Sequence, residues 1–536
     1  MPHPDSATPS TRALVARRAL LGAVLLGILA DPLLRNGPWG LGLLVWMAAF
    51  AGVVLVLVRQ NRRPLSLETG SWLAVAVLFA AGLSWRDSDM LTFFTVLAML
   101  TALTLLAMAL GASPVPGLAS ARVRDLIDAA FKTGLDVAAG VVPLLTRDPE
   151  HAAVRPTTDG SAKRIGKAVL ITVPILVVFT LLLADADPIF GSFFTLPDIQ
   201  VDVLLSHVFI AGFFAWVVAG WLRRSRLAPS GPARTPTTTL SFTLGTTDVT
   251  VALGALNVLF AAFVVVQIGW LFGGEALVRQ TTGLSYAQYA RHGFFELTWV
   301  AGLLLPLLLG AQALIPASEA RTRRIYERLA VPLVVLLGAI MVSAGARMHL
   351  YVHYYGISAD RLYASTFMIW LAIVFVWFAL TVLRSRPRSF AAGLVITGLG
   401  VLFTLNVLNP DALVARANLA RGDEQSRVMG ADLPYVASLG GDAVPVLVAA
   451  LTAPDRGAAM ASPADRCAAA RILLDRWTGE KRTRAGHRWT QWNAARSRAT
   501  AAVRAHEADL RKLACSKDAA ASAASTGPSS APPSPL

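Results

Sequence analysis

Long apolar runs separated by short polar connections dominate the chain up to residue 408. A helix rises 1.5 Å per residue, so about 20 mostly apolar residues cross a hydrocarbon core about 30 Å thick. Eleven runs are candidates for membrane-spanning helices, at 14–34, 39–58, 71–85, 91–111, 168–184, 203–222, 249–272, 294–315, 330–346, 365–383 and 390–408, of which the third and the ninth are short. The pattern predicts an all-α, polytopic membrane helix bundle.

The pattern changes after residue 408, where amphipathic segments separated by Pro and Gly replace the apolar runs. These segments predict a small water-facing helical domain over 409–515, with helices at 412–420, 433–439, 443–451, 464–477 and 488–513. Residues 516–536 are rich in Ala, Ser and Pro, a composition that predicts a disordered tail. The remaining organisation is a disordered N-terminus over 1–13 and a transmembrane domain over 14–408 that includes a long loop at 112–167.

The composition agrees with a membrane protein. Hydrophobic residues make up 55% of the 536 residues and charged residues 15%, whereas soluble domains carry about 25% charged residues. This balance excludes a soluble enzyme and a disordered chain. The net charge of +15 does not indicate nucleic-acid binding, because the basic residues cluster between apolar runs, where they set membrane orientation.

Lysines and arginines are distributed unequally between alternate connections. One side holds 25 of them before the tail and the other side holds 6. Basic residues concentrate on the cytoplasmic side of membrane proteins. With eleven spans, this asymmetry predicts a cytoplasmic N-terminus, a cytoplasmic loop at 112–167 and an extracytoplasmic C-terminal domain.

The long cytoplasmic loop contains apolar residues at helical spacing. Val123, Leu126, Ile127 and Phe131 follow this spacing, and basic residues stand beside them. A helix of this kind lies on the anionic inner leaflet, with membrane lipid as its partner. The alternative is a regulatory contact with another protein.

Three motifs occur in order along the second part of the chain: YAQYARHGFFEL at 286–297, RMHLYVHYYGISADRLY at 347–363 and NPDALVARANL at 409–419. With these motifs the chain resembles the bacterial multi-pass membrane family catalogued as domain of unknown function 4173. The resemblance implies a location in the bacterial cell (inner) membrane and carries no established activity.

The predicted topology places all three motifs at the outer face. There they offer Glu296, Arg347, Tyr351, His353 and Asn409 as a hydrated vestibule that binds a polar or anionic group. The alternative is structural, because Glu296 and Arg347 could form an ion pair that holds two helices together. Gly356 is expected to end the helix that carries Arg347, and Ser358 is expected to cap the next helix.

The sequence offers no cofactor or catalytic motif. His349 and His353 have a spacing that could present two imidazoles to zinc, but a zinc site needs further ligands. A phosphate-binding loop, a dinucleotide fingerprint and hydrolase motifs are absent from the sequence. We therefore expect no metal, no cofactor and no catalytic residue.

Both cysteines, Cys467 and Cys515, lie in the predicted extracytoplasmic domain. An oxidising compartment permits disulfides. If the helices at 464–477 and 488–513 fold back on each other, these cysteines become neighbours. The alternative is two unrelated thiols.

These features favour a non-enzymatic membrane protein, either a sensor or an assembly protein, with an extracytoplasmic ligand or protein partner. A transporter of a small polar or anionic solute is one alternative, although no internal repeat is visible. A membrane enzyme acting on a lipid-linked substrate is another, with Glu296 or His353 as acid or base. The oligomeric state does not follow from the sequence.

Overall fold

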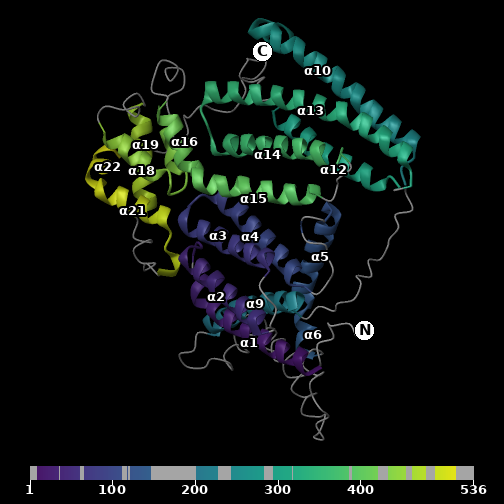
Figure 1. The fold of residues 1–536 in the computed structure, drawn as a ribbon. Helices are drawn as coiled ribbons and strands as arrows, with labels where there is room; N and C mark the ends of the chain where they lie inside the picture. Colours follow the sequence, from purple (N-terminus) through teal and green to yellow (C-terminus); the bar gives the residue numbers. More distant parts are fainter. Residues whose placement is uncertain are drawn as a thin grey trace, which may run out of the picture.

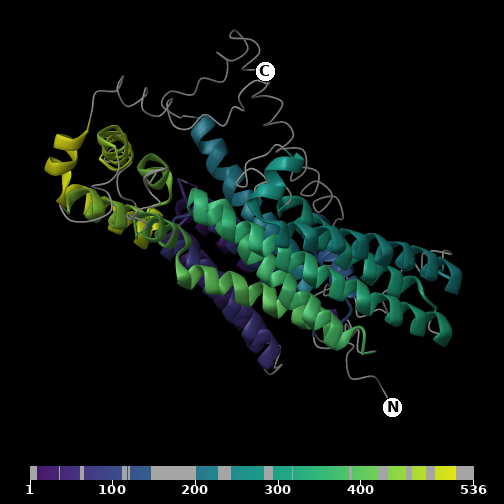
Figure 2. The ribbon, with the colours of Figure 1, turned by 90° about the horizontal axis from the view of Figure 1, so that it is seen from above.

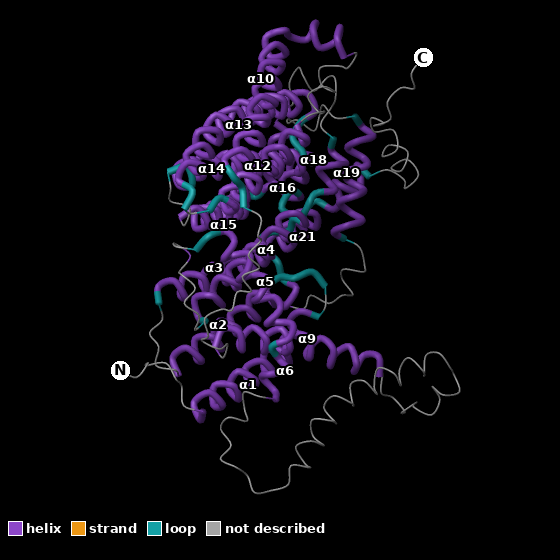
Figure 3. The backbone as a smooth tube through the Cα atoms, turned by 90° about the vertical axis from the view of Figure 1, so that its right-hand side faces the viewer, coloured by secondary structure: helices purple, strands orange, loops and turns teal. Residues whose placement is uncertain are grey.

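The computed structural model describes residues 9–35, 37–60, 66–111, 118, 121–146, 201–226, 243–282, 294–316, 318–384, 389–420, 432–453, 462–478 and 489–514. Within these ranges every regular element is a helix, as Figure 3 shows. The predicted all-α fold class is confirmed.

Ten helices in the described ranges are long and apolar enough to cross a membrane. They are α1 (Pro9–Leu34), α2 (Leu41–Gln60), α3 (Leu67–Trp85), α4 (Asp89–Leu110), α9 (Val201–Arg226), α10 (Thr246–Thr282), α12 (Phe294–Leu314), α13 (Ala320–Tyr355), α14 (Ala359–Thr381) and α15 (Phe390–Leu408). Each matches a predicted span, and the eleventh prediction, at 168–184, lies outside the described residues. Helix α1 begins earlier than expected, within the segment predicted to be disordered.

The spans pack in two halves, each with its own apolar core. Helices α1 to α4 and α9 share one core, which we call the first half, and α10 with α12 to α15 share the second, which we call the second half. Figures 1 and 3 show the halves as two layers of the bundle, and α15 packs against α4 where they meet. Apolar side chains on the outside of both halves are exposed, as expected of surfaces that face lipid.

The C-terminal domain covers one end of the bundle, which we call the domain face (Figure 2). The α1–α2, α3–α4 and α13–α14 connections and the end of α15 all contact this domain. Because successive spans alternate in direction, the start of α1 lies at the opposite end, as the predicted topology requires. Which end is extracytoplasmic stays a prediction from the charge asymmetry.

The described helices also bear on the predicted span at 168–184. Helix α4 ends away from the domain face, whereas α9 begins at that face, where His207 contacts Asp31 of α1 and Ser206 contacts Arg35, the residue after α1. The described residues on either side of 147–200 therefore lie at opposite ends of the bundle (Figure 1). The fifth of the eleven predicted spans falls between them and stays a prediction.

The predicted amphipathic helix is present as α5 (Val123–Ala139), which is followed by α6 (Val141–Thr146). One face of α5 packs on α9, where Asp136 pairs with Arg224 at 3.3 Å. The opposite face exposes Ile127, Phe131 and Leu135. In Figure 1, α5 runs across the direction of the spans, at the end of the bundle away from the domain.

The C-terminal domain consists of α16 (Pro410–Ala420), α17 (Leu433–Ser438), α18 (Val444–Thr452), α19 (Pro463–Trp477), the 3-10 helix η6 (Trp489–Gln491), α21 (Ala494–Ala505) and α22 (Glu507–Leu513). Its helices enclose an apolar core of their own, centred on Trp477, which is 1% exposed. The first four predicted helices of this domain are confirmed.

The single helix predicted at 488–513 is wrong, because the structure divides it into η6, α21 and α22. Trp492 and Asn493 lie between η6 and α21 and contact the bundle: the Trp492 carbonyl accepts from Leu41 N, and the Asn493 amide donates to Leu83 and Arg86 carbonyls. The backbone at Asn493 is extended, and its side chain both bonds to the bundle and accepts from Arg496 N to cap α21. Docking against the bundle thus overrides the local preference for helix.

The predicted helix ends at the α13–α14 connection are confirmed. Gly356 ends α13 with a φ of 77°, a conformation that favours glycine. The Ser358 hydroxyl accepts a hydrogen bond from the Arg361 backbone N–H and caps α14. The predicted span at 330–346 and the helix beyond it form one continuous helix, α13.

Candidate functional site

The C-terminal domain meets the domain face through a group of buried and partly buried polar side chains, which we call the polar seam: Arg86, Asp87, Ser88, Asn409, Asp411, Asp442, Asn493 and Arg496. Three of them follow α3, one caps α15, and four belong to the domain. Buried polar groups are stable when each is hydrogen-bonded. The partners of each group therefore determine how firmly the domain is held.

Asp442 lies at the centre of the polar seam, with its side chain 2% exposed. Its Oδ1 accepts from Arg86 Nη1 at 3.2 Å and from Asn409 Nδ2 at 2.9 Å. Its Oδ2 accepts from the Asp87 backbone N–H at 3.1 Å. One buried carboxylate of the domain thus joins the α3–α4 connection to the end of α15.

Arg86 uses its remaining donors on the C-terminus of α15. Its Nε donates to the Asn406 carbonyl at 2.6 Å, and its Nη2 donates to the Val407 carbonyl at 3.1 Å. The last carbonyls of a helix have no partner within the helix, and the helix dipole there favours a cation. Arg86 therefore links the first half, the second half and the domain.

Asn409 turns the chain from α15 into the domain. It is the sole non-glycine residue in the described ranges with a positive φ, at 59°. Asparagine tolerates this left-handed conformation better than most residues. Its Oδ1 accepts from Ala412 N at 3.4 Å, and Pro410 occupies the first position of α16, where a missing N–H costs nothing.

Asp411 is a second buried carboxylate, 3% exposed. It accepts from the Ser88 hydroxyl at 3.2 Å and from Gly440 N at 2.9 Å. Burial raises the pKa of Asp411 from an ordinary 3.8 to about 6, and the hydrogen bonds from Gly440 and Ser88 oppose the shift. The carboxylates of Asp442 and Asp87 raise this pKa further.

This shift predicts that the docked domain loses stability as the pH rises from about 4 to about 6. Below that range Asp411 is protonated in both the folded and the unfolded chain. Within it the unfolded chain gives up its proton first, so the folded state is destabilised by up to about 3 kcal/mol. The Asp411→Asn side chain has nearly the same shape as aspartate but does not titrate, so the variant should lack this pH-dependent loss of stability.

Thermal unfolding of both proteins in lipid nanodiscs at about pH 4 and about pH 7 measures the effect. The wild type should lose more stability on going to the higher pH than Asp411→Asn does. An equal pH dependence in the two proteins would rule out Asp411 as the titrating group.

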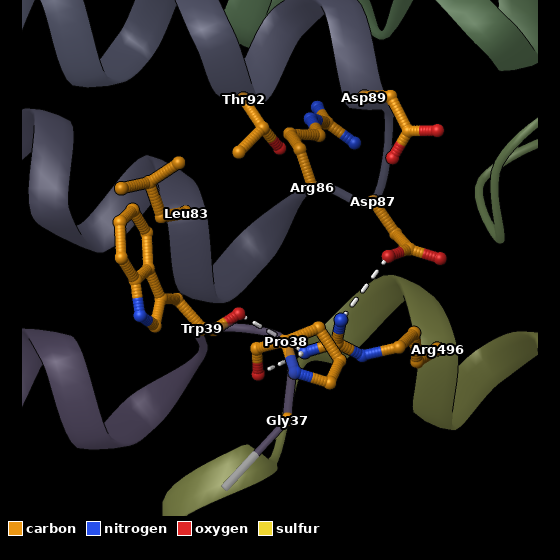
Figure 4. A pocket seen from close by; sticks show the side chains of 9 residues that line it. All are labelled: Gly37, Pro38, Trp39, Leu83, Arg86, Asp87, Asp89, Thr92 and Arg496. Atoms are coloured by element: carbon orange, nitrogen blue, oxygen red, sulfur yellow. Dashed lines mark hydrogen bonds and ion pairs between the residues drawn. The ribbon is translucent and has the colours of Figure 1, made fainter. Parts of the chain in front are cut away.

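A small pocket of about 250 Å³ adjoins the polar seam on the first-half side (Figure 4). Arg496 of α21 reaches across it and donates to Asp87 Oδ1 at 3.3 Å and to the Trp39 carbonyl at 3.1 Å. Burial lowers the pKa of the Arg496 guanidinium, and Asp87 opposes this shift. Arg86 and Asp89 also line the pocket, so its wall carries both positive and negative side chains.

The domain also contacts the second half directly. The Asn418 side chain pairs with the backbone of Ile357, accepting from N at 2.9 Å and donating to O at 2.7 Å. The Tyr435 hydroxyl accepts from Ala359 N at 2.8 Å. The domain therefore contacts the α13–α14 connection as well as the α3–α4 connection.

Of the residues predicted to line a vestibule, Asn409 belongs to the polar seam. The other four lie on α12 and α13: Glu296 is exposed in the first turn of α12, and His353 is exposed in the last turn of α13. Arg347 donates to Gln267 Oε1 of α10 at 2.5 Å. The Tyr351 ring lies 4.0 Å from the Arg361 guanidinium carbon.

A single vestibule that joins Asn409 to Glu296 and Arg347 stays a prediction, as does the Glu296–Arg347 pair. Arg347 and Ser343 both donate to Gln267, which is 8% exposed. This arrangement is a polar connection between α10 and α13. Residues 286–293 of the first motif lie outside the described residues.

Sequence reasoning missed Arg86, Asp87, Asp411, Asp442 and Arg496 as site residues. In the sequence analysis Arg86 was only one of the six basic residues on the predicted outer side. The signal that could have found the group was the sequence Arg86-Asp87-Ser88-Asp89 directly after a span, together with the Gly-Gly-Asp sequence at 440–442. Among described residues, no group of three or more His, Cys, Asp or Glu could hold a metal ion.

Comparison with known proteins gives one match. The family model described as domain of unknown function DUF4153 matches residues 73–450. No curated protein and no solved structure matches the chain. The family number expected from the three motifs, 4173, is not confirmed. The match covers most of the spans together with α16 to α18 of the domain, and on this evidence the chain belongs to the DUF4153 family.

Proposed function

We propose that this protein is a non-enzymatic sensor of the bacterial inner membrane, with its C-terminal domain on the extracytoplasmic side. The observation that carries the proposal is the double attachment of the domain. Its Asp442, Asn493 and Arg496 hold the first half, while Asn418 and Tyr435 hold the second half. A partner that binds the domain would change how the two halves sit against each other.

Helix α15 offers a physical connection from the domain to the opposite face. It ends at Asn409 in the polar seam, and its other end belongs to the part of the bundle that packs on α5. The exposed stripe of Ile127, Phe131 and Leu135 on α5, with Arg124 beside it, suits an anionic leaflet. In this proposal α5 is the element that reports the state of the domain to the cytoplasm.

Hydrogen exchange of the full chain in nanodiscs tests the proposal. Asp442→Asn weakens the attachment of the domain without touching α5. A sensor requires faster exchange in residues 123–139 as well as in the α3–α4 connection, because coupling between distant sites is a measurable free energy.

The matched control is Asp475→Asn, which removes a carboxylate of the same domain from an exposed pair with Arg471. This control should leave the exchange of α5 unchanged. If Asp442→Asn accelerates exchange solely at the domain face, the domain is a static assembly platform and the sensor proposal is wrong.

The disulfide between Cys467 and Cys515 stays a prediction, because Cys515 lies outside the described residues. Two observations support it: α22 packs against α19, which carries Cys467, and Cys467, the one cysteine among the described residues, is not a free thiol. The enclosed loop of about 48 residues would stabilise the domain by about 4 kcal/mol. Mass mapping of unreduced protein should find the two cysteine peptides linked.

This bond also tests the side of the membrane on which the domain lies, since a reducing cytoplasm keeps thiols free. Both cysteines fully alkylated after acid quench would contradict the bond and weaken the extracytoplasmic placement. An active alkaline phosphatase fused after Leu536 would support that placement independently.

A further inference from the structure

The described surface of the C-terminal domain has two exposed large apolar side chains, and both belong to one short segment. Trp489 is 57% exposed and Trp492 is 46% exposed. They stand at the start of η6 and directly after it. Apolar surface of this size on a water-facing domain indicates a contact with something apolar.

This segment lies at the level where a span begins. The Trp492 carbonyl accepts from the backbone N–H of Leu41 at 2.9 Å, and Leu41 is the first residue of α2. Thr490, between the two tryptophans, is 8% exposed and faces the bundle. The segment therefore packs against the start of a membrane-spanning helix.

Glycines in the bundle make room for this segment. A Cβ on Gly40 would lie 2.4 Å from the Trp492 carbonyl oxygen, and a Cβ on Gly42 would lie 2.9 Å from the Thr490 carbonyl oxygen. Both distances are shorter than real side chains allow. The close contact between η6 and the start of α2 thus requires glycine at positions 40 and 42.

Two further exposed tryptophans lie at the ends of neighbouring spans. Trp39 is 44% exposed just before α2, and Trp85 is 56% exposed as the last residue of α3. The Arg498 guanidinium lies 5.9 Å from the Trp85 ring centre. Tryptophan is enriched at membrane–water interfaces, where its ring is apolar and its N–H meets the headgroups.

We propose that η6 anchors the C-terminal domain in the membrane interface: Trp489 and Trp492 lie among the phospholipid headgroups of the leaflet on the domain side, level with Trp39 and Trp85. The occupant of this surface is lipid, because the patch continues the lipid-facing surface of the spans beside it. The inference does not depend on the sensor function. It makes the domain a membrane-seated unit and not a freely projecting one.

Power-saturation EPR in vesicles of phosphatidylcholine and phosphatidylglycerol tests the proposal. A nitroxide on a genetically encoded keto amino acid replaces Trp489, Trp492 or, as the control, Asp475, which is 60% exposed in the same domain. This labelling leaves both cysteines in place. Labels at 489 and 492 should be several times more accessible to oxygen, relative to a water-soluble nickel chelate, than the label at 475.

Accessibility to the nickel chelate equal to that at 475 would overturn the proposal. So would dipolar broadening between labels on two chains, which would identify the patch as a contact between copies. A second measurement avoids the bulky label: brominated phospholipids should quench less fluorescence in the Trp489→Phe, Trp492→Phe double variant than in the wild type. Equal quenching in the two proteins would also contradict the anchor.

Discussion

Asp442→Asn should lower the free energy of unfolding by about 3 kcal/mol or more. The substitution leaves the Arg86 guanidinium, whose side chain is 12% exposed, without its carboxylate partner. Removing one member of a buried ion pair costs about 3–5 kcal/mol, because the remaining charge keeps its desolvation cost without the opposite charge that offset it. Thermal or denaturant unfolding in nanodiscs measures the loss.

A double-mutant cycle shows whether this loss belongs to the pair. Arg86→Gln together with Asp442→Asn should cost clearly less than the sum of the two single substitutions. The control cycle uses Arg471→Gln and Asp475→Asn, an exposed pair 3.2 Å apart, which should contribute at most about 1 kcal/mol. Additive effects of Arg86 and Asp442 would mean that the two side chains are not coupled.

Gly440→Ala should be the most damaging substitution among those that add a single methyl group. A Cβ at this position would lie 1.6 Å from the Asp87 carbonyl oxygen and 2.5 Å from Asp411 Oδ2. Backbone atoms cannot move aside as a flexible side chain does, so the loop must leave the α3–α4 connection. The cost should reach the upper end of the roughly 1–3 kcal/mol typical of overpacking.

Hydrogen exchange of residues 83–92 and 432–452 reports the separation directly. Gly400→Ala in α15 is the matched control, because a Cβ there meets nothing within 4 Å. Within a helix that change should be neutral or stabilising by about 1 kcal/mol. Wild-type protection of both segments in Gly440→Ala would show that the close approach of Gly440 to Asp87 does not exist.

The spans and several helix ends could be predicted from the sequence because their causes are local. Hydropathy over about 20 residues fixes a span, and Gly356 and Ser358 each act through the backbone beside them. The same local reasoning failed at residues 488–513. There the helix is interrupted because Asn493 bonds to Leu83 and Arg86, which lie about 400 residues earlier in the chain.

The polar seam escaped prediction for the same reason. Nothing in the local sequence around Arg86, Asn409 or Asp442 marks them as site residues. They form a site because the fold brings them into contact. A single arginine after a span reads as an orientation signal, and a Gly-Gly-Asp sequence reads as a turn. The fold shows that Arg86 bonds to α15 of the second half and to Asp442 of the C-terminal domain.

Pulsed EPR distances test most directly the central claim, that one domain is held rigidly against both halves. Nitroxides on keto amino acids would replace three exposed acidic residues: Asp475 in the domain, Asp89 at the start of α4 in the first half, and Asp360 in α14 in the second half. The structure predicts a single narrow distance distribution for Asp475 with each of the other two positions. A broad or multiple distribution for either pair would contradict the claim.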